Sequence, residues 1–342
     1  MALKVDIEKA FEGFSLRVKF DAEQGPLALL GASGCGKSVT LKCIAGLIKP
    51  DRGRILLDGV TLYDSEKRID LPPQQRRVGY LFQNYALFPH MTVAQNIGAA
   101  AVGDKKARQA VVREQLKRFH LEDAAHLLPH QLSGGQQQRT ALARILASNP
   151  QAILLDEPLS ALDSFLKQQL EAELMETLES FGKTVVWVSH DRGEVYRTCP
   201  SVCVLDHGTS EKVRPMAELF ADPQTVAAAR LTGCETFLDA VPKGETVYLP
   251  QWDVTLSCGR PVPEDIRCIG IRASAVHLAA QGAENALPCR VVRRAADLHA
   301  DTALLCVKDG GPLLRMEGAR GTLPTGSEWC AAIAPKDILL LK

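Results

Sequence analysis

The sequence lacks the features that would place the protein within a membrane, outside the cell or on nucleic acid. Although 46% of its 342 residues are hydrophobic, no uninterrupted apolar run reaches the ~18–20 residues of a membrane-spanning helix. Forty Lys and Arg balance forty Asp and Glu, so we expect no general electrostatic affinity for nucleic acid. Residues 1–6 alternate like a strand and have no apolar signal core, so we expect no secretory signal.

The cysteines also lack the spacing typical of metal sites. Ten are present, but no two form a Cys-x-x-Cys pair. Cys199, Cys203 and His207 are close in sequence, yet Cys203 lies within the apolar run 201–205. A buried strand is therefore favoured there over a metal site. We expect the thiols to be reduced, as in cytosolic proteins.

The length predicts two domains, each large enough to bury a core. Residues 1–222 alternate short apolar runs with helical stretches, which predicts an α/β domain. Buried strands are expected at 26–30, 152–156 and 184–189, because continuous apolar runs are typical of parallel strands covered on both faces. Strong strand signals are absent from about 91 to 149, so we expect a helical subdomain there.

The remaining residues, 223–342, have a different sequence pattern. Helical patterns give way to short β-like runs broken by Gly and Pro, which predicts a small all-β barrel. The runs lie at 246–249, 266–272, 287–292, 302–307, 329–333 and 338–341.

One segment is basic within the otherwise neutral chain. Residues 104–120 carry six Lys or Arg against two Asp or Glu. A phosphate- or lipid-binding patch is one interpretation of this charge. We favour a solvated helix face, since the whole chain is neutral.

Residues 31–38, Gly-Ala-Ser-Gly-Cys-Gly-Lys-Ser, match the phosphate-binding loop G-x-x-x-x-G-K-[ST] between a strand and a helix pattern. The glycines let backbone N–H groups face phosphates, and the helix N-terminus adds partial positive charge. Lys37 is predicted to reach the β- and γ-phosphates, and Ser38 to bind Mg²⁺. The predicted nucleotide-binding residues here are Gly31, Ala32, Ser33, Gly34, Cys35, Gly36, Lys37, Ser38 and Val39.

Further polar residues lie at the ends of the predicted strands. Asp156 ends the strand 152–156 and is placed to meet Mg²⁺. Glu157 follows it and either polarises the attacking water or is a simple surface carboxylate. His190 follows the strand 184–189, which we expect beside 152–156, so His190 is predicted to contact the γ-phosphate.

Residues 132–139, Leu-Ser-Gly-Gly-Gln-Gln-Gln-Arg, open another helix pattern. Ser133 and Gln136 have the spacing of a capping box. Capping does not account for Gly134 and Gly135, which leave bare N–H groups at the helix start. These residues predict a second anion-binding position.

Together these motifs make about residues 1–220 resemble the ATPases of the ATP-binding cassette (ABC) family. On this resemblance, 31–38 is the Walker A loop, 152–156 the Walker B strand and 132–136 the signature. The resemblance also assigns single residues. Gln83 is the Q-loop glutamine, a Mg²⁺ ligand with Ser38 and Asp156, and Asp163 belongs to the D-loop 160–163. The catalytic set is Glu157, His190 and Gln83.

The resemblance implies that two copies pack head to tail. Each ATP then lies between the Walker A loop of one copy and the signature of the other. The other copy would contribute Ser133, Gly134, Gly135, Gln136 and Asp163. The family stacks adenine on an early aromatic residue. Phe11 is our assignment, with Phe14 the alternative, and either is otherwise a core residue.

Residues 71–93 resemble importer ATPases, in which the segment from Gln83 to Pro89 receives a helix of the membrane permease. Exposed Tyr85, Leu87 and Phe88 would suit that contact, unless they belong to the core.

The C-terminal segment resembles the OB-like (TOBE) regulatory domain of the same importers. Residues 270–276, Gly-Ile-Arg-Ala-Ser-Ala-Val, match its signature except at Ala273 and Ser274, which replace Pro-Glu. That variant and the stretch 62–81 resemble molybdate importer ATPases, and 287–342 resembles an oxyanion-binding (MOP-like) β-domain.

The resemblance therefore implies an ATPase on the cytoplasmic face of the inner membrane, serving permease subunits and an extracytoplasmic solute-binding protein. Molybdate or tungstate is the first cargo expected, before sulfate or thiosulfate and then iron, polyamine or sugar. A cassette acting on DNA or ribosomes would carry long insertions or a second cassette, which this sequence lacks. Intact Lys37, Asp156, Glu157 and His190 argue against a regulator without catalysis.

Overall fold

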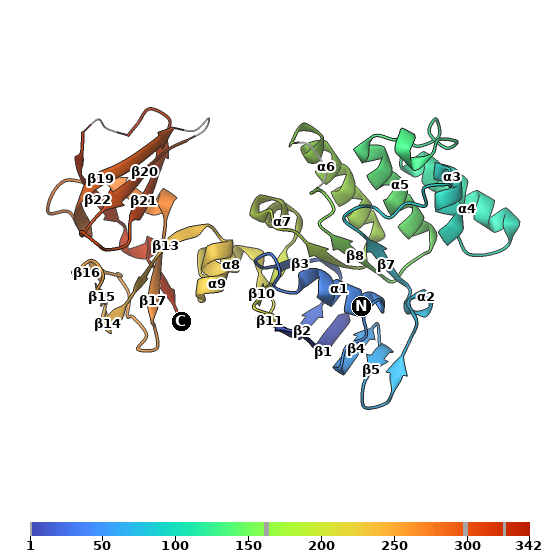
Figure 1. Ribbon diagram of the computed structural model, residues 1–342, viewed down its shortest axis with the longest axis horizontal. Helices are drawn as coiled ribbons and strands as arrows, with labels where there is room; N and C mark the ends of the chain where they lie inside the picture. Colours follow the sequence, from blue (N-terminus) through green and yellow to red (C-terminus); the bar gives the residue numbers. More distant parts are fainter. Residues whose placement is uncertain (1, 161–163, 297–299, 324–325) are drawn as a thin grey trace. The chain divides into compact units, whose positions relative to one another are not determined.

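The structure is a computed structural model that describes residues 2–160, 164–296, 300–323 and 326–342 (Figure 1). The chain divides into two compact units, Met1–Ala217 and Glu218–Lys342. The division falls a few residues before the boundary at 222 that we expect. The difference arises because helix α8 (Met216–Ala221) spans the division and α9 (Val226–Leu231) lies within the second unit.

The first unit is built on a mixed sheet with strand order β6-β5-β4-β1-β2-β11-β10-β3-β9-β8-β7. The predicted strands at 26–30, 152–156 and 184–189 are confirmed as β3, β8 and β9. The strands β10, β3, β9, β8 and β7 pair in parallel, so the predicted neighbours β8 and β9 do lie side by side. The strand bounds are β1 (Leu3–Phe11), β2 (Phe14–Ala22), β3 (Gly25–Leu30), β4 (Arg52–Leu57), β5 (Val60–Asp64), β6 (Ile69–Asp70), β7 (Val78–Leu81), β8 (Ala152–Asp156), β9 (Thr184–Val188), β10 (Ser201–Asp206), β11 (Thr209–Ser210) and β12 (Arg214–Pro215).

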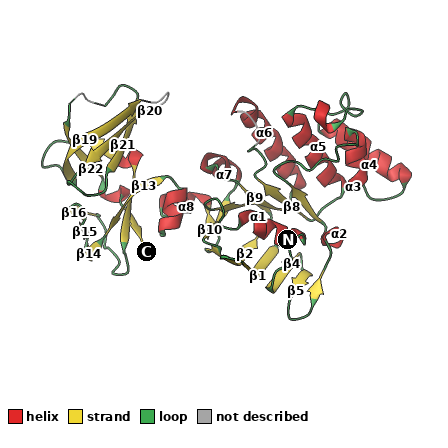
Figure 2. Ribbon diagram, viewed as in Figure 1, coloured by secondary structure: helices red, strands yellow, loops and turns green. Residues whose placement is uncertain are grey.

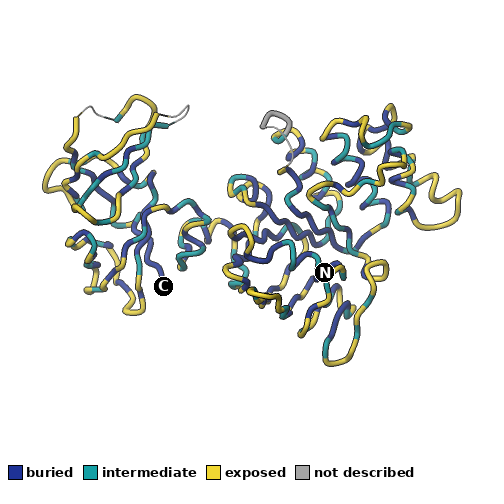
Figure 3. Tube along the Cα trace, viewed as in Figure 1, coloured by how far each residue is buried: buried dark blue, intermediate teal, exposed yellow. Residues whose placement is uncertain are grey.

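The burial of each strand follows its sequence pattern (Figure 3). Every residue of β8 and β9 is buried, as continuous apolar runs require in a parallel sheet covered on both faces. In β1, by contrast, Leu3, Val5 and Ile7 are buried while Lys4 and Asp6 are exposed. That alternation is typical of an antiparallel strand with one solvated face, and β1 pairs antiparallel with β2 and β4.

Helices provide the rest of this unit (Figure 2). They are α1 (Lys37–Ala45), α2 (Pro73–Arg76), α3 (Val93–Ala100), α4 (Lys105–Arg118), α5 (Gly134–Ala147), α6 (Ser164–Phe181) and α7 (Arg192–Thr198), with a short 3₁₀ turn at Pro129–Gln131. Between the paired strands β7 and β8 the chain forms helices and turns alone, and all of residues 82–151 are described. In the described part of the chain, we find no helix with the length and apolarity needed to cross a membrane.

The second unit is β-rich, as expected from its short apolar runs. Three sheets, ordered β13-β17-β23, β14-β15-β16 and β18-β22-β19-β20-β21, contribute buried side chains to a common core. The strands are β13 (Cys234–Asp239), β14 (Val241–Lys243), β15 (Thr246–Leu249), β16 (Val254–Ser257), β17 (Cys268–Arg272), β18 (Val276–Leu278), β19 (Ala286–Ala296), β20 (Ala300–Cys306), β21 (Leu314–Ala319), β22 (Glu328–Ile333) and β23 (Leu339–Leu341).

The Gly-Ile-Arg run has a structural role in this second unit. Arg272 ends β17, and its Nη2 donates to the Phe220 carbonyl at 2.5 Å and to Thr232 Oγ1 at 3.2 Å. The arginine therefore fastens the sheet to the segment that contains α8 and α9.

Candidate nucleotide-binding site

The phosphate-binding loop turns sharply between β3 and α1. Gly34 and Gly36 have φ values of 79° and 106°, a region that favours glycine. A Cβ on Gly31 would lie 2.3 Å from the Leu205 carbonyl oxygen, so only glycine fits beside β10. The sequence therefore places glycine where this backbone conformation and this close approach require it.

The lysine of the loop lies folded against its own backbone. Lys37 is only 7% exposed, and its Nζ donates to the carbonyls of Gly31 at 2.7 Å and Ala32 at 2.9 Å. The same ammonium lies 3.8 Å from Cys35 Sγ. Burial raises the pKa of the Cys35 thiol, and the positive charge of Lys37 partly opposes that rise.

A cavity of about 500 Å³ opens over this loop. Among its lining residues are Phe11, Phe14, Glu157 and His190, which the sequence places far from the loop and the fold brings to it. The lining residues are Phe11, Phe14, Ser33, Gly34, Gly36, Lys37, Ser38, Val39, Glu157 and His190.

The two candidate aromatic residues differ in their surroundings. The Phe11 ring is 41% exposed, whereas Phe14 packs against the buried core of the unit. A Cβ on Gly36 would lie 3.1 Å from the Phe14 ring, so Phe14 supports the phosphate-binding loop itself. Phe11 is thus the more exposed of the two aromatic residues at the cavity, and Lys9 Nζ lies 5.7 Å from its ring centroid.

Asp156 is held at the carboxyl end of β8 by two hydroxyl groups. Ser38 Oγ donates to Asp156 Oδ1 and the Tyr80 hydroxyl donates to Oδ2, both at 2.8 Å. Burial, reinforced by the negative charge of Asp156, raises the pKa of Tyr80, so the tyrosine remains a donor. Sequence analysis did not single out Tyr80, because only the pairing of β7 with β8 in the folded chain brings it to Asp156.

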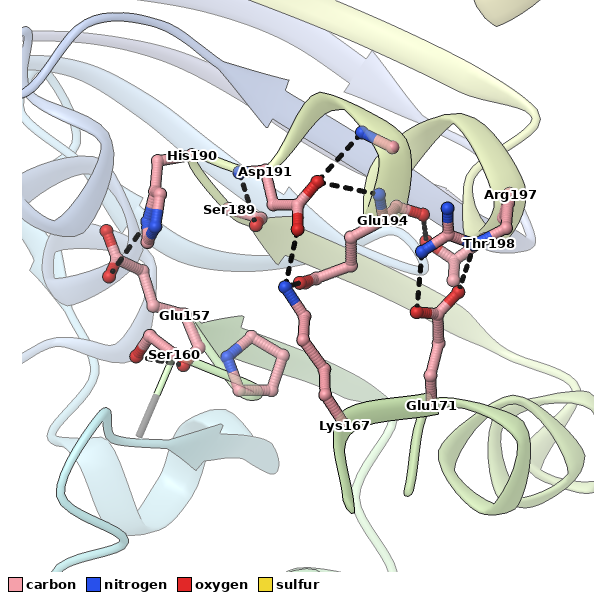
Figure 4. Close-up of polar contacts among 12 residues, drawn as sticks. Glu157, Ser160, Lys167, Glu171, Ser189, His190, Asp191, Glu194, Arg197 and Thr198 are labelled. Carbon is pink, nitrogen blue, oxygen red and sulfur yellow. Dashed lines mark hydrogen bonds and ion pairs between the residues drawn. The ribbon is translucent and has the colours of Figure 1, made fainter. Parts of the chain in front are cut away.

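Glu157 stands between the other two predicted catalytic residues. Its Oε2 accepts from Gln83 Nε2 at 3.2 Å. The same oxygen lies 3.3 Å from His190 Nδ1, a contact that Figure 4 shows. Glu157 has a φ of 51°, and its N–H donates to the Val188 carbonyl at 2.9 Å. This unusual conformation for a non-glycine residue is held by β9 and turns the carboxylate toward Gln83 and His190.

Gln83 does not join the predicted metal ligands in this structure. Its Nε2 contacts Glu157 and also Ser160 Oγ, at 3.3 Å. Among the hydrogen bonds of the described residues, none links Gln83 to Ser38 or Asp156. The structure thus gathers the predicted residues in two adjoining groups, one at Asp156 and one at Glu157.

The 132–136 segment starts α5, as its capping pattern predicts. Ser133 Oγ accepts from the Gln136 N–H at 3.3 Å, and Gln136 Oε1 accepts from the Ser133 N–H at 3.0 Å. Gly134 is exposed, but Gly135 is buried, where a Cβ would lie 3.1 Å from Leu170 of α6. Close packing therefore accounts for Gly135. The lining of the cavity over the loop includes none of residues 133–136, all of them described.

Two other predictions concern residues outside this cavity. Asp163 lies outside the described residues. The segment from Gln83 to Pro89 is described, and the expectation that Tyr85 is exposed is wrong, because its side chain is 5% exposed. Phe88 is 46% exposed, and the Arg144 guanidinium lies over its ring at 5.3 Å.

A second cavity, about 1040 Å³, adjoins this segment between α3 and α4. Met91, Ala94 and Val112 contribute apolar surface to it, and Lys105 and Arg108 contribute positive charge. The full lining is His90, Met91, Ala94, Gln95, Gly98, Ala99, Gly103, Lys105, Arg108, Gln109, Val112, Arg113 and Leu116. The basic segment 104–120 is thus one wall of a groove as well as a solvated helix face.

A phosphate-binding loop between the buried parallel strand β3 and a helix, with carboxylates at the end of β8, two strands along the same sheet, defines the class of P-loop nucleotide-binding proteins. The chain belongs to the ABC transporter family, whose sequence pattern matches residues 16–160. The molybdate/tungstate import ATP-binding protein WtpC of Pyrococcus horikoshii is 36% identical over 331 residues, covering 94% of this chain and 93% of that protein.

Other relatives match chiefly the first unit. The putrescine transport ATP-binding protein PotG of Escherichia coli is 41% identical over 219 residues. That alignment covers 63% of this chain but only 56% of PotG, so little more than half of that relative is matched. Among solved structures, the ATP-binding cassette MJ0796, a dimer bound to ADP and Pi, is similar with a TM-score of 0.53 and 30% identity, covering 63% of this chain and 99% of that one.

Proposed function

We propose that the protein is the ATP-hydrolysing subunit of an ABC importer. The observation that carries this proposal is the position of the Glu157 carboxylate, which lines the cavity over the phosphate-binding loop between Gln83 and His190. A carboxylate in that position can accept a proton from water that attacks a bound γ-phosphate.

The loop and its surroundings are suited to ATP. Residues 31–39 offer N–H groups and the helix N-terminus of α1 to the phosphates. When ATP binds, the Lys37 ammonium would give up its hydrogen bonds to the Gly31 and Ala32 carbonyls. It would donate instead to phosphate oxygens, which form stronger charge-assisted hydrogen bonds. Phe11 stacks on the adenine ring.

The residues at the end of β8 fit Mg²⁺. Ser38 Oγ and Asp156 Oδ1 lie 2.8 Å apart, and hydroxyl and carboxylate oxygens are the hard ligands that Mg²⁺ prefers. Gln83 would complete this set of ligands by giving up its hydrogen bond with Glu157 and binding the metal. When bound, Mg²⁺ neutralises negative charge on the phosphates.

The hydrolytic step rests on positioning and charge. Glu157 orients the water and takes its proton, and His190, with its side chain 66% exposed at the cavity, contacts the γ-phosphate. Gln83 is hydrogen-bonded to Glu157 and is also a proposed metal ligand. Its contacts would therefore change when nucleotide and metal bind.

A second copy of the chain completes each site. Ser133, Gly134, Gly135, Gln136 and Asp163 of one copy meet the nucleotide held by residues 31–39 of the other. Two observations support this arrangement. Residues 133–136, all described, do not line the cavity of their own copy, and the similar cassette MJ0796 was solved as a dimer.

A membrane permease docks beside the segment from Gln83 to Pro89. The exposed Phe88 ring and the adjoining groove between α3 and α4 suit the apolar face of a short helix. Lys105 and Arg108 on the groove wall favour acidic residues on that helix. As part of this proposal, the protein acts on the cytoplasmic face of the membrane, opposite an extracytoplasmic solute-binding protein.

We assign molybdate or tungstate as the cargo. The molybdate/tungstate relative aligns over 94% of this chain, which includes the second unit, whereas the PotG alignment covers 63%. Polyamine is the second candidate, because the putrescine relative has the higher identity within its shorter alignment.

The test is Glu157→Gln, which keeps the shape of the side chain but removes its ability to accept a proton. The purified variant should bind ATP with unchanged affinity and lose at least about 10²-fold in hydrolysis.

Cells that rely on the chain for transport should lose radiolabelled molybdate uptake on the same substitution, with spermidine uptake as the control. Near-normal hydrolysis by the variant would remove Glu157 from its role, and loss of spermidine uptake alone would reassign the cargo.

A further inference from the structure

A cluster of charged side chains joins α6 to α7 next to His190 (Figure 4). Lys167 Nζ lies 2.5 Å from Asp191 Oδ2 and 3.2 Å from Glu194 Oε2. Lys167 comes from the first turn of α6, whereas the two carboxylates flank the start of α7. Figure 4 shows the ammonium group between the two carboxylates, so one cation pairs with both acids.

The two carboxylates are fixed on their other sides by the chain around His190. Asp191 Oδ1 accepts from the N–H groups of Gly193 at 2.9 Å and Glu194 at 3.2 Å, which caps α7. Glu194 Oε1 accepts from Trp187 Nε1 at 2.8 Å, and Trp187 belongs to β9. In the chain, His190 lies between Trp187 and Asp191. Asp191 contacts Lys167 directly, and Trp187 is linked to Lys167 through Glu194.

This arrangement depends on the positive charge. Glu194 is 2% exposed, and burial raises its pKa, while the contacts with Trp187 and Lys167 lower it. Without Lys167, a buried carboxylate would lose its only cation among the described contacts and would face Asp191. The turn that carries His190 would then rearrange to separate or hydrate the two acids.

We propose that Lys167 is a positioning residue that fixes His190 against Glu157. It acts through Asp191, Glu194 and Trp187 and does not itself touch the reacting atoms. The catalytic part of this inference rests on the proposed function. The geometric part, the distance between His190 Nδ1 and Glu157 Oε2 of 3.3 Å, does not.

A second ion pair between the same helices provides a matched control. Arg197 of α7 donates to Glu171 of α6 through two bonds, Nε to Oε1 at 2.7 Å and Nη2 to Oε2 at 2.9 Å. This pair lies one helical turn further along each helix than Lys167 and Glu194. Among the described residues, the hydrogen bonds and ion pairs of Arg197 reach Glu171 alone, and its charge acts on Asp191 and Glu194 only from a longer distance. If Lys167 only held α6 against α7, removing Lys167 or Arg197 would have the same effect on the position of His190.

The experiment compares Lys167→Met, Lys167→Arg and Arg197→Met. The first readout is the His190 imidazole resonance in nucleotide-free protein by NMR, assigned through its loss in His190→Gln. Lys167→Met should move this resonance and its titration midpoint, Lys167→Arg should largely restore both, and Arg197→Met should leave them unchanged. The second readout is hydrolysis, in which Lys167→Met should lower kcat about 10-fold or more, with ATP affinity changed less than about twofold.

Three outcomes would overturn the inference. They are an unchanged His190 resonance in Lys167→Met, an unchanged kcat, or the same changes in Arg197→Met. If Lys167→Met does not fold, the double variant Lys167→Met/Glu194→Gln also removes the buried charge of Glu194. It should fold with the His190 resonance still shifted, because Asp191 has lost its cation. If the unaltered protein does not hydrolyse ATP but Lys167→Met moves the His190 resonance, the positioning role stands and the proposed function fails.

Discussion

Phe11 and Phe14 show how neighbouring residues of one type acquire different roles. They face each other across the turn between β1 and β2, with ring centroids 6.3 Å apart. The Phe14 ring packs toward Gly36 and the core, which commits it to support the loop. Only the Phe11 ring keeps a large exposed face on the cavity, so the assignment of adenine stacking to Phe11 now has a geometric basis.

Substitution of these two residues separates binding from stability. Phe11→Ala should weaken ATP binding by about 1–3 kcal/mol, the usual contribution of one base stacked on an aromatic ring, with little change in melting temperature. Phe14→Ala should mainly lower the melting temperature, because it removes packing beneath the loop. The checks are titration with a fluorescent ATP analogue and thermal unfolding. A folded Phe14→Ala protein with the larger loss of affinity would move the stacking role to Phe14.

Single residues also mark the limit of what the sequence can predict. The loop 31–38 is recognisable because all its functional parts are local. Tyr80 contacts Asp156 across 76 positions, and Lys167 contacts Asp191 across 24. Neither has a local pattern that sets it apart from an ordinary strand tyrosine or helix lysine, so only the folded chain reveals them.

At the scale of elements, α1 depends on one buried cation at its C-terminal end. Arg76 of α2 donates through Nη1 to the carbonyls of Cys43 and Ile44 at 2.8 and 2.9 Å, and through Nε to Leu71 at 2.7 Å. These bonds satisfy carbonyls that a helix end leaves without partners. The side chain also pairs with Asp70 at 2.9 Å. The helix that presents Lys37 and Ser38 is therefore anchored at both ends.

Arg76→Met should destabilise the protein by about 2–4 kcal/mol, because it removes the donors to the Ile44 and Leu71 carbonyls and one of the two donors to Cys43. Arg77→Met, at the exposed neighbouring position, is the control and should change stability by less than about 0.5 kcal/mol. Urea unfolding followed by circular dichroism measures both. Equal stability of the two variants would show that Arg76 does not hold the end of α1.

The elements themselves were predictable to different degrees. The strands β3, β8 and β9 are continuous apolar runs, and such runs have few alternatives in an α/β chain. The antiparallel strands β4, β5 and β6 were not anticipated, since pairing partners are chosen by long-range contacts. The prediction that Tyr85 is exposed was wrong because the sequence around an aromatic residue does not show whether its side chain is buried or exposed. The fold buries Tyr85.

At the scale of the whole molecule, the residues of the candidate site come from one unit, and we propose that a second copy completes the site. Residues 31–39, Asp156, Glu157 and His190 gather around one cavity and its edge. Gly134, at the capped start of α5, is exposed and is not among the residues that line that cavity. We propose that Ser133 and Gly134 of one copy close the ATP site of the other.

Sedimentation of two variants with ATP tests this claim most directly. Glu157→Gln cannot turn over ATP, so ATP should convert it from monomer to dimer. Glu157→Gln/Ser133→Arg should bind ATP with the same affinity, because its phosphate-binding loop is intact, yet remain monomeric, because the arginine blocks closure by the partner. ATP-driven dimerisation of the double variant equal to that of Glu157→Gln, or its failure to bind ATP at all, would contradict the account.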